Sequence, residues 1–228
     1  MSFEGILIIN KPEKMTSYDV IRKLKPHLKK TKIGHAGTLD PFATGILIVA
    51  VGKKYTKTLS KYQDLNKTYQ FVIQLGKTTS TLDPDSEISD TQPVPADLTE
   101  EKINTILNSF KGESKQLPPN FCAKKINGTR AYKLARAGKE VELKPAKITI
   151  ESIKLIHFSK EKNQIECKIV CSKGTYVRSL SRDIAQKCNT IGYTINLQRN
   201  SIGPYTIKNS QNLTTLLESL TPLQTKTN

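Results

Sequence analysis

The sequence contains few residues that hold metal ions. It has only three histidines, and four cysteines, Cys122, Cys167, Cys171 and Cys188. None of the cysteines forms a C-x-x-C pair, the spacing typical of zinc sites, so we expect no metal. Cys167 and Cys171 fall on one face of an alternating strand pattern, where cysteine behaves as a small buried hydrophobic residue. We expect free thiols in a reducing compartment.

Long apolar segments are also missing. No stretch approaches the roughly 20 apolar residues that a membrane-spanning helix needs. The first residues, MSFEGILIIN, carry Glu4 where a signal peptide has a basic residue, and their apolar run is short. We therefore expect a cytoplasmic protein with no membrane partner.

Acidic residues are scarce relative to basic ones. The chain has 36 Lys and Arg residues against 20 Asp and Glu residues, which gives a formal net charge of +16. A surface of this kind suits a polyanion, either a nucleic acid or an anionic membrane. Because nothing in the sequence supports a membrane, a nucleic acid is the expected partner.

The length of 228 residues allows one large domain or two small ones. We find no internal repeat and no linker, which favours one compact domain over residues 1–228. Alternating or continuous apolar residues predict strands over residues 6–9, 46–51, 67–76, 148–158, 165–171, 194–197 and 205–207. Helical spacing predicts helices from Ser17 with a kink at Pro26, and over residues 103–110, 178–188 and 213–220. Residues 10–12 are expected to turn and residues 82–101 to form a long surface loop, and the whole is typical of an α+β fold.

The stretch Gly34–Gly45, GHAGTLDPFATG, combines glycines with one histidine, His35, and one acid, Asp40. Pro41 restricts the backbone of Asp40 and so fixes how the carboxylate is presented. The glycines allow another chain, such as an RNA backbone, to approach closely. Two interpretations of Asp40 are open, a side chain that caps a turn and a carboxylate used in chemistry.

Two segments are dense in basic residues. Residues 11–32 precede the glycine-rich stretch, and residues 111–147 interleave Lys and Arg with Phe121 and Tyr132. Cations that meet phosphates and aromatic rings that stack on bases suit RNA. For any one of these residues, a solvated helix face or loop is the alternative.

Several separated stretches resemble, in order and over nearly the whole chain, the TruB-like (B-type) tRNA pseudouridine synthases. They are NKPEKMTS (Asn10–Ser17), GHAGTLDPFATGIL (Gly34–Leu47), KTYQFVIQLG (Lys67–Gly76), FKGESKQLPPNFCAKKINGTRAYKLARAG (Phe110–Gly138), CSKGTYVRSLSRDIA (Cys171–Ala185) and LQRNSIGPY (Leu197–Tyr205).

The resemblance implies a pseudouridine synthase fold, in which helices and loops flank a central mixed, largely antiparallel sheet. It implies an isomerase that converts uridine 55 in the T loop of tRNA to pseudouridine, by cleaving the C1′–N1 bond and rejoining the base through C5. No cofactor or metal is implied, and the expected partner is the T arm of tRNA, bound by a monomer. Residues 111–147 correspond to an RNA-gripping insertion, and the C-terminal PUA domain common in the family is expected to be absent.

The resemblance also assigns functions to individual residues. Asp40 is the expected nucleophile, with Tyr69 and Arg178 as the other catalytic residues. Substrate-binding positions are expected at His35, Tyr176, Leu197, Lys11 and Asp83. RNA-binding positions are expected at Lys124, Lys125, Arg130, Tyr132 and Arg136.

These residue types fit the reaction. A carboxylate nucleophile must be ionised, and a neighbouring guanidinium favours that form, so we predict an Asp40–Arg178 ion pair. Tyr69 would stack under the flipped base and accept a late proton, the alternative being a core tyrosine. His35 would fill the gap left by the flipped uridine, the alternative being an ordinary histidine. Lys11 would support the loop.

Three positions depart from the family pattern, namely Lys14 in place of a usual glycine, Ser80 in place of a usual aspartate and Gln198 in place of a usual arginine. None is a catalytic position. Two other functions stay open. One is a non-catalytic RNA-binding module, because GHAG matches the G-x-x-G clamp of KH domains. The other is a synthase that acts on a different RNA.

Overall fold

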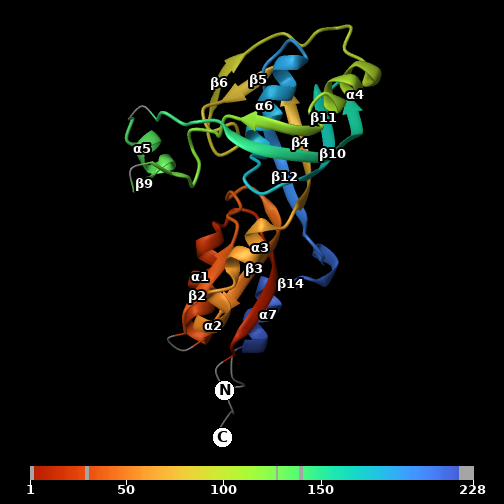
Figure 1. The fold of residues 1–228 in the computed structure, drawn as a ribbon. Helices are drawn as coiled ribbons and strands as arrows, with labels where there is room; N and C mark the ends of the chain where they lie inside the picture. The colour runs from red at the N-terminus through yellow and green to blue at the C-terminus, as the bar shows by residue number, and fades with distance from the viewer. Residues whose placement is uncertain (1–2, 29–30, 127, 139–140, 221–228) are drawn as a thin grey trace, which may run out of the picture. The chain divides into compact units, whose positions relative to one another are not determined.

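The computed structural model describes residues 3–28, 31–126, 128–138 and 141–220 of the chain (Figure 1). Its internal contacts divide the chain into two compact units. The first unit consists of Met1–Leu65 and Arg199–Asn228, and the second of Asn66–Gln198. The two ends of the chain therefore fold together, and the middle folds as a unit of its own. The single catalytic domain predicted for the whole chain stays a prediction, because two packed units can belong to one domain.

The sheet of the first unit is centred on β3 (Thr44–Val51). β1 (Gly5–Lys11) and β2 (Ile33–Ala36) both pair with it antiparallel. β14 (Gln211–Asn212) pairs parallel with β1, and β13 (Tyr205–Thr206) pairs antiparallel with the end of β12 (Gly192–Ile202). The strand predicted over residues 6–9 is confirmed, although Asn10 and Lys11 continue β1 where a turn was expected.

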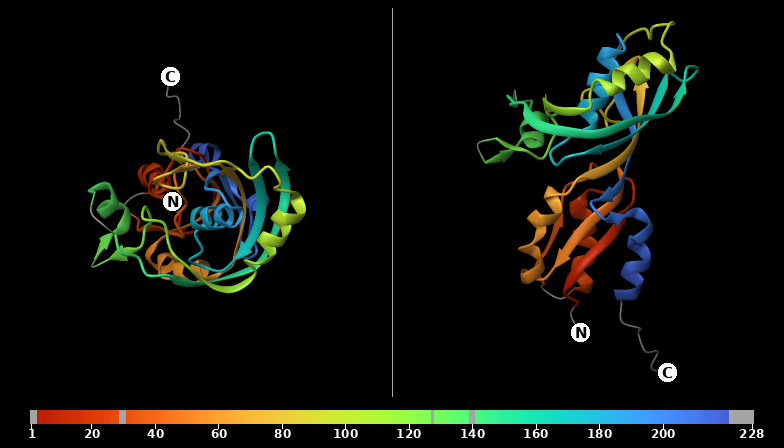
Figure 2. Two further views of the ribbon diagram at one scale, coloured as in Figure 1. Left: turned by 90° about the horizontal axis from the view of Figure 1, so that it is seen from above. Right: turned by 45° about the vertical axis from the view of Figure 1, so that its right-hand side comes forward.

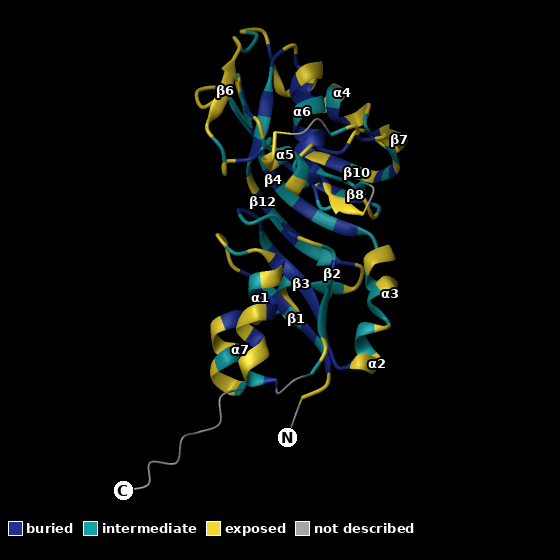
Figure 3. Cartoon of the chain, turned by 90° about the vertical axis from the view of Figure 1, so that its left-hand side faces the viewer, coloured by how far each residue is buried: buried dark blue, intermediate teal, exposed yellow. Residues whose placement is uncertain are grey.

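Helices cover both faces of this sheet (Figure 3). α1 (Ser17–Leu24) and α7 (Leu213–Leu220) lie on one face, and α2 (Lys53–Thr56) and α3 (Leu59–Asp64) lie on the other. The core under α1 and α7 includes Leu7, Val20, Leu24, Leu47, Val49, Leu213 and Leu216. The core on the opposite face is built around Ala36, Ile46, Ile48 and Ile202. β3 is thus buried on both faces, which accounts for its uninterrupted apolar run.

α1 begins where the sequence predicts. The Thr16 Oγ1 accepts the backbone N–H of Asp19 at 3.0 Å, and the Asp19 carboxylate accepts the backbone N–H of Thr16 at 2.9 Å. This reciprocal capping box satisfies two backbone donors at the start of the helix. The α-helix ends at Leu24 and continues as the 3-10 helix η1 (Lys25–His27), because Pro26 cannot donate a helical hydrogen bond. The predicted kink is confirmed.

The sheet of the second unit contains β4 (Lys67–Leu75), β11 (Gln164–Cys171), β10 (Ala146–Ser159) and β7 (Gly112–Gln116), each antiparallel to its neighbour. The first part of β12 lies next to β4. The buried residues alternate along the two central strands and are Tyr69, Phe71, Ile73, Leu75, Ile165, Cys167, Ile169 and Cys171. The predicted alternation is confirmed, and β10 and β11 form an antiparallel hairpin.

Two helices pack on this second sheet (Figure 2). α4 (Glu100–Asn108) contacts β10 and buries Ile103 and Leu107, and α6 (Val177–Lys187) contacts β4 and buries Leu180 and Ile184. Both helices were predicted, with boundaries that differ by up to three residues. The last predicted helix is confirmed as α7.

Two segments of the second unit differ from expectation. Residues of the expected surface loop form β6 (Ile88–Thr91), which pairs with β5 (Lys77–Thr79). β7 belongs to the main sheet although it lies inside the segment predicted as an insertion. Every residue of β6 and all but the last of β7 are exposed. These strands therefore lack the apolar alternation on which the prediction depended.

The remainder of the predicted insertion has its own small structure. β8 (Lys125–Ile126) and β9 (Thr129–Arg130) form a two-stranded antiparallel sheet, and α5 (Ala131–Arg136) follows at once. A second 3-10 helix, η2 (Ile207–Asn209), precedes β14 in the first unit.

The fold class is confirmed. The strand pairs named above are antiparallel apart from β1 with β14, and helices pack on the sheet in both units, as in a mixed, largely antiparallel α+β fold. The structural neighbours reported below agree with it. Of the helices that the structure describes, none combines the length and apolar character required to cross a membrane.

Lys14, at the position where the resembled family usually has glycine, has a left-handed backbone with a φ of 61°. A side chain in this region costs about 1 kcal/mol, part of which glycine loses again through its freedom in the unfolded chain. We expect Lys14→Gly to raise the free energy of unfolding by about 0.5 kcal/mol, measured by urea denaturation. Lys14→Ala removes the same charge but keeps the Cβ, so an equal gain in that control would contradict the explanation.

Candidate active site

Asp40 lies in the loop that connects β2 to β3. Its backbone carbonyl accepts the N–H of Ala43 at 3.1 Å, which closes a turn with Pro41 at its second position. Pro41 and Phe42 form this turn and β3 begins at Thr44, so Asp40 does not start a helix. Leu39 and Phe42 on either side are buried, whereas Asp40 itself is only half-buried. The loop therefore fixes its apolar residues in the core and keeps the carboxylate residue partly accessible.

Two side chains hold the backbone on either side of Asp40. The Ser17 Oγ accepts the N–H of Leu39 at 2.8 Å and lies 3.3 Å from the Leu39 carbonyl, to which it can donate. The Lys11 Nζ donates to the carbonyl of Pro41 at 3.2 Å. Ser17 is the first residue of α1 and Lys11 the last of β1, so a helix and a strand both position the loop.

Lys11 is fully buried. Its Nζ also donates to the carbonyls of Pro12 at 2.8 Å and Met15 at 2.6 Å, at the two ends of the turn that contains Lys14. Burial lowers the pKa of Lys11 to about 8, against the opposing effect of the Asp40 charge, and the Arg199 charge adds to the lowering. Three carbonyls around one ammonium fit the predicted supporting role better than direct contact with substrate.

His35 is half-buried on β2, where its backbone lies opposite Val49 of β3. A Cβ on Gly34, the residue before it, would lie 2.9 Å from Leu59 Cδ1, so the Leu59 side chain would have to shift to make room for it. The role of His35 in filling an RNA stack and the approach of RNA to Gly34 stay predictions.

Arg178 is the second residue of α6 and is almost completely buried. Its Nη1 donates to the carbonyl of Thr81 at 2.7 Å and its Nη2 to the carbonyl of Phe121 at 2.8 Å. Its Nη1 also lies 3.2 Å from Asp83 Oδ2, in an ion pair whose two side chains are 4% and 7% exposed. Within the second unit, the carboxylate that faces Arg178 is therefore Asp83, which the sequence assigned to substrate binding.

Asp83 lies in a short loop that is held together by its own hydrogen bonds. Its backbone N–H donates to Thr79 Oγ1 at 3.1 Å, and the Thr79 hydroxyl donates to the Asp83 carbonyl at 2.8 Å. Its Oδ1 accepts the Thr81 hydroxyl and the backbone N–H of Asp85. The buried carboxylate is thus satisfied on both oxygens, as a charge away from water requires.

Tyr69 is buried on β4 opposite Ile169 of β11. Leu197, on β12, is buried as well. Asp40 belongs to the first unit, whereas Tyr69 and Arg178 belong to the second. The Asp40–Arg178 ion pair and the stacking role of Tyr69 stay predictions.

Tyr176 connects the predicted insertion to α6. It packs against a small cluster formed by Cys122, Ala131 and Leu143. Its backbone N–H donates to Gln116 Oε1 at 2.8 Å, and its carbonyl accepts from Gln116 Nε2 at 3.1 Å. Because Tyr176 directly precedes α6, the same contacts fix the start of the helix that carries Arg178.

The predicted RNA-binding residues gather around β8, β9 and α5. Lys124, Arg130 and Arg136 are exposed, and the Arg136 guanidinium lies 5.8 Å from the centre of the Tyr132 ring. The backbone of Lys125 pairs with Arg130, but its side chain lies outside the described part of the structure. Exposed cations next to an aromatic ring fit RNA binding, which stays a prediction for each residue.

Sequence reasoning missed Ser17, Gln116 and Arg199 as parts of the site. Ser17 and Gln116 are buried polar residues that bind backbone groups of distant segments, so the signal that identifies them is tertiary. Arg199 stood within a quoted motif without an assigned role, and it is 1% exposed.

The four cysteines are buried and free, as expected. Burial raises the pKa of Cys167 to about 12 and the pKa of Cys171 and of Cys188 to about 11. Thiols held in the neutral form are poor nucleophiles, which suits packing residues. Among the described residues, no group of three or more His, Cys, Asp and Glu side chains is placed to hold a metal ion.

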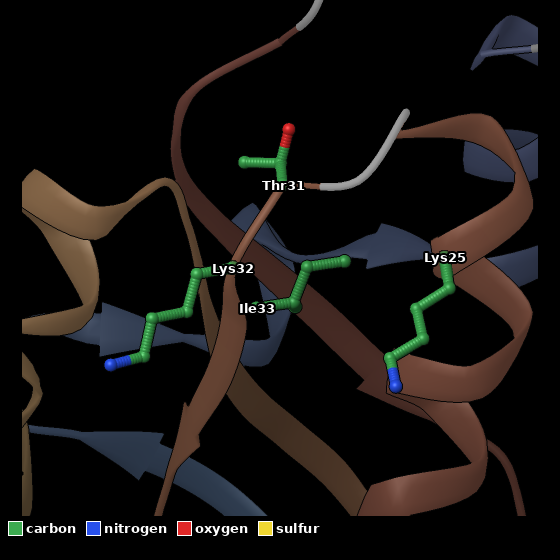
Figure 4. Close-up of a pocket in the computed structure, with 4 residues that line it drawn as sticks. All are labelled: Lys25, Thr31, Lys32 and Ile33. Atoms are coloured by element: carbon green, nitrogen blue, oxygen red, sulfur yellow. The ribbon is translucent and has the colours of Figure 1, made fainter.

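A hollow of about 420 Å³ lies elsewhere in the first unit, lined by Lys25, Thr31, Lys32 and Ile33 (Figure 4). In the close-up the lysine ammonium groups diverge from one another. None of the predicted site residues lines it, so we do not include it in the candidate site.

Comparison with known proteins agrees with the family resemblance seen in the sequence. The sequence model of the TruB family of pseudouridylate synthases, N-terminal domain, matches residues 25–177. The tRNA pseudouridine synthase B of Aquifex aeolicus is 41% identical over 96% of this chain and 75% of its own length. The enzyme of the same name from Bacteroides fragilis is 43% identical over 87% of this chain and 86% of its own. The chain belongs to the TruB family of pseudouridylate synthases.

Solved structures show the same fold. A chain in the crystal structure of a Cbf5-Nop10-Gar1 complex superposes with a TM-score of 0.71 at 24% identity, covering 94% of this chain and 54% of that one. A chain in an H/ACA RNP bound to a substrate RNA gives a TM-score of 0.68 at 22% identity, with 94% and 52% coverage. This chain spans about half the length of those two chains, and the likeness concerns the fold alone.

The buried Arg178–Asp83 pair gives a test of stability. Asp83→Asn leaves the Arg178 charge buried without its counter-ion, so we expect the free energy of unfolding to fall by about 3 kcal/mol. Asp85→Asn is the matched control, because Asp85 is exposed and should change stability by less than about 0.5 kcal/mol. Urea denaturation of both variants measures the difference. Equal stability of the two would show that the pair contributes nothing.

The lowered pKa of Lys11 predicts a pH dependence. Between pH about 8 and 10.5, the folded protein has released a proton that the unfolded chain still holds. The Lys11 contribution to the free energy of unfolding therefore rises as the pH rises through this window. Lys11→Met lacks the titrating group, so the stability of the wild type relative to Lys11→Met should increase with pH. A difference that stays constant, measured by urea denaturation across the window, would contradict a lowered pKa.

Proposed function

We propose that the protein isomerises uridine 55 in the T loop of tRNA to pseudouridine, as a monomer in the cytoplasm. The C1′–N1 bond breaks, the uracil turns, and a C1′–C5 bond forms. The hydrogen on C5 is lost to solvent and N1 gains a proton, so the reaction is an isomerisation with no change in redox state. The names of the TruB relatives, which are tRNA pseudouridine synthases, support the choice of tRNA.

Asp40 is proposed as the nucleophile, and its loop is the observation that carries the proposal. A carboxylate that attacks in one orientation must be held still. The backbone is anchored immediately before Asp40 by Ser17 and immediately after it by Lys11. The residue between these anchors is partly accessible, which suits a group that meets a large substrate.

Arg178 and Tyr69 are proposed as the other catalytic residues. The Arg178 guanidinium is already held by two carbonyls and Asp83. Its side chain would therefore lose little further conformational entropy when substrate binds. Tyr69 is on the regular strand β4, where its ring is held by its neighbours and can serve as a platform for a base. Leu197, buried on β12, is proposed to line the uracil pocket.

The segment from β8 to α5 is proposed to grip the RNA. Lys124, Arg130 and Arg136 are exposed there, and the net charge of +16 adds long-range attraction for phosphates. Tyr176 packs against the small apolar cluster of this segment and directly precedes α6, so it connects the segment to the start of that helix. RNA bound by the segment would thus act on the element that carries Arg178.

Tritium release tests the proposal. On unmodified tRNA with tritium at uridine C5, the wild type should release the label to water, because isomerisation must expel that hydrogen. Asp40→Asn should abolish release and keep tRNA affinity within about tenfold, since the substitution is isosteric and removes only the nucleophile. Filter binding gives the affinity, and the exposed Asp90→Asn is the matched control.

Three results would contradict the proposal. An Asp40→Asn variant that still releases tritium would remove Asp40 from the chemistry. A wild-type protein that binds tRNA and releases no label would be a binding module. A tRNA with cytidine at position 55, labelled at its other uridines, locates the reaction, because release from it would mean that the enzyme acts elsewhere.

A further inference from the structure

Arg199 is one of the largest fully buried side chains of the first unit. It lies in the last part of β12 and is 1% exposed. A guanidinium away from water is stable only where fixed acceptors replace its hydration. The position of those acceptors shows what the residue holds.

The acceptors of Arg199 lie on both sides of the Asp40 loop. Its Nε donates to the carbonyl of Ile46 at 2.7 Å, and its Nη2 donates to the carbonyl of Gly37 at 3.1 Å. Gly37 precedes Asp40 and Ile46 follows it in β3. Because the donors of a guanidinium form a rigid fork, one side chain sets the distance between the start of the loop and the strand that follows it.

The backbone of Arg199 also touches the start of β3, directly after this loop. A Cβ on Gly45 would lie 2.3 Å from the Arg199 carbonyl oxygen, and the φ of Gly45 is +103°. Only glycine fits there. The chain that approaches Gly45 is therefore the protein's own strand β12, rather than an RNA backbone as the sequence suggested. β12 thus contacts the start of β3 through its backbone and the loop through the Arg199 side chain.

Three side chains thus hold the Asp40 loop at separate points. Ser17 binds Leu39, Lys11 binds Pro41, and Arg199 binds the two ends of the loop. The charge of Arg199 also reaches Lys11, where it disfavours the protonated amine. Of the three residues, Arg199 is the one that connects the loop to β12.

We propose that Arg199 is a positioning residue, which sets the orientation of the Asp40 carboxylate by fixing the carbonyls of Gly37 and Ile46. The inference rests on the proposed function, in which Asp40 is the nucleophile. Arg199 itself touches no reacting atom in this proposal. Its effect should appear in the rate of the chemical step and not in the affinity for tRNA.

Two variants test the proposal. Arg199→Met keeps the apolar part of the side chain and removes every hydrogen-bond donor. Arg199→Lys keeps the positive charge but lacks the planar guanidinium that reaches two carbonyls at once. We expect the single-turnover rate of tritium release to fall about 100-fold in Arg199→Met, and less in Arg199→Lys, because a small misplacement of a reacting group has effects of this size. The dissociation constant for tRNA should stay within about threefold. Arg182→Lys is the matched control, since Arg182 pairs with Asp183 and is partly exposed.

Hydrogen exchange separates positioning from general stability. In the Arg199 variants, the amides of residues 37–40, 42 and 43 should exchange faster than in the wild type, while those of β4 and β11 should not change. A purely structural role would speed exchange throughout the protein, and the rate of tritium release would then follow the folded fraction. Should Arg199→Met fail to fold, both the rate of tritium release and the hydrogen exchange are measured on Arg199→Lys, which keeps a cation at the buried position.

The inference is wrong if a folded Arg199→Met, or the folded Arg199→Lys in its place, releases tritium at the wild-type rate. It is equally wrong if exchange rises throughout the protein. Failure of the proposed function looks different, because Asp40→Asn would then remain active. If Asp40→Asn is inactive and the Arg199 variants are fully active, the proposed function stands and only the role of Arg199 is refuted.

Discussion

The candidate site depends on hydrogen bonds that buried cations donate to backbone carbonyls. A loop that leaves regular secondary structure has carbonyls without strand or helix partners, and a buried ammonium or guanidinium has donors without water. In the first unit these two groups satisfy each other, because Lys11 and Arg199 donate hydrogen bonds to carbonyls before and after Asp40. The loop is therefore held by these two side chains, which β1 and β12 supply, in addition to its own buried apolar residues Leu39 and Phe42.

The second unit uses the same interaction with a different charge balance. Arg178 binds the carbonyls of Thr81 and Phe121, which lie far apart in the sequence, and Asp83 neutralises it within hydrogen-bonding distance. One side chain thereby joins α6, the loop after β5 and the segment before β8. Any movement of the segment before β8 that shifts Phe121 must also act on Arg178, because a buried guanidinium cannot give up an acceptor without cost. This contact would couple the segment proposed to bind RNA to the arginine proposed as catalytic.

Sequence patterns predicted the elements whose burial is periodic. β4 and β11 alternate, α6 buries Leu180 and Ile184 one turn apart, and Pro26 ends α1, so local chemistry was enough in each case. β6 was missed because all its residues are exposed, and the continuation of β1 was missed because Asn10 and Lys11 are polar. Motifs pointed to Asp40 and Arg178. The partner Asp83 and the support from Ser17, Gln116 and Arg199 come from segments that only tertiary structure brings together.

The net charge does not distinguish two kinds of basic residue in this chain, those buried in the protein and those exposed on its surface. Lys11, Arg178 and Arg199 are counted in the charge of +16, yet each is buried and donates to backbone carbonyls of the protein. Their charges therefore hold loops in place. Exposed residues such as Lys124, Arg130 and Arg136 are better placed to meet the phosphates of an RNA. A basic residue in a conspicuous motif is therefore evidence for an RNA contact only when its side chain reaches the surface. In the first unit, the buried cations Lys11 and Arg199 instead hold the loop of the residue proposed for catalysis.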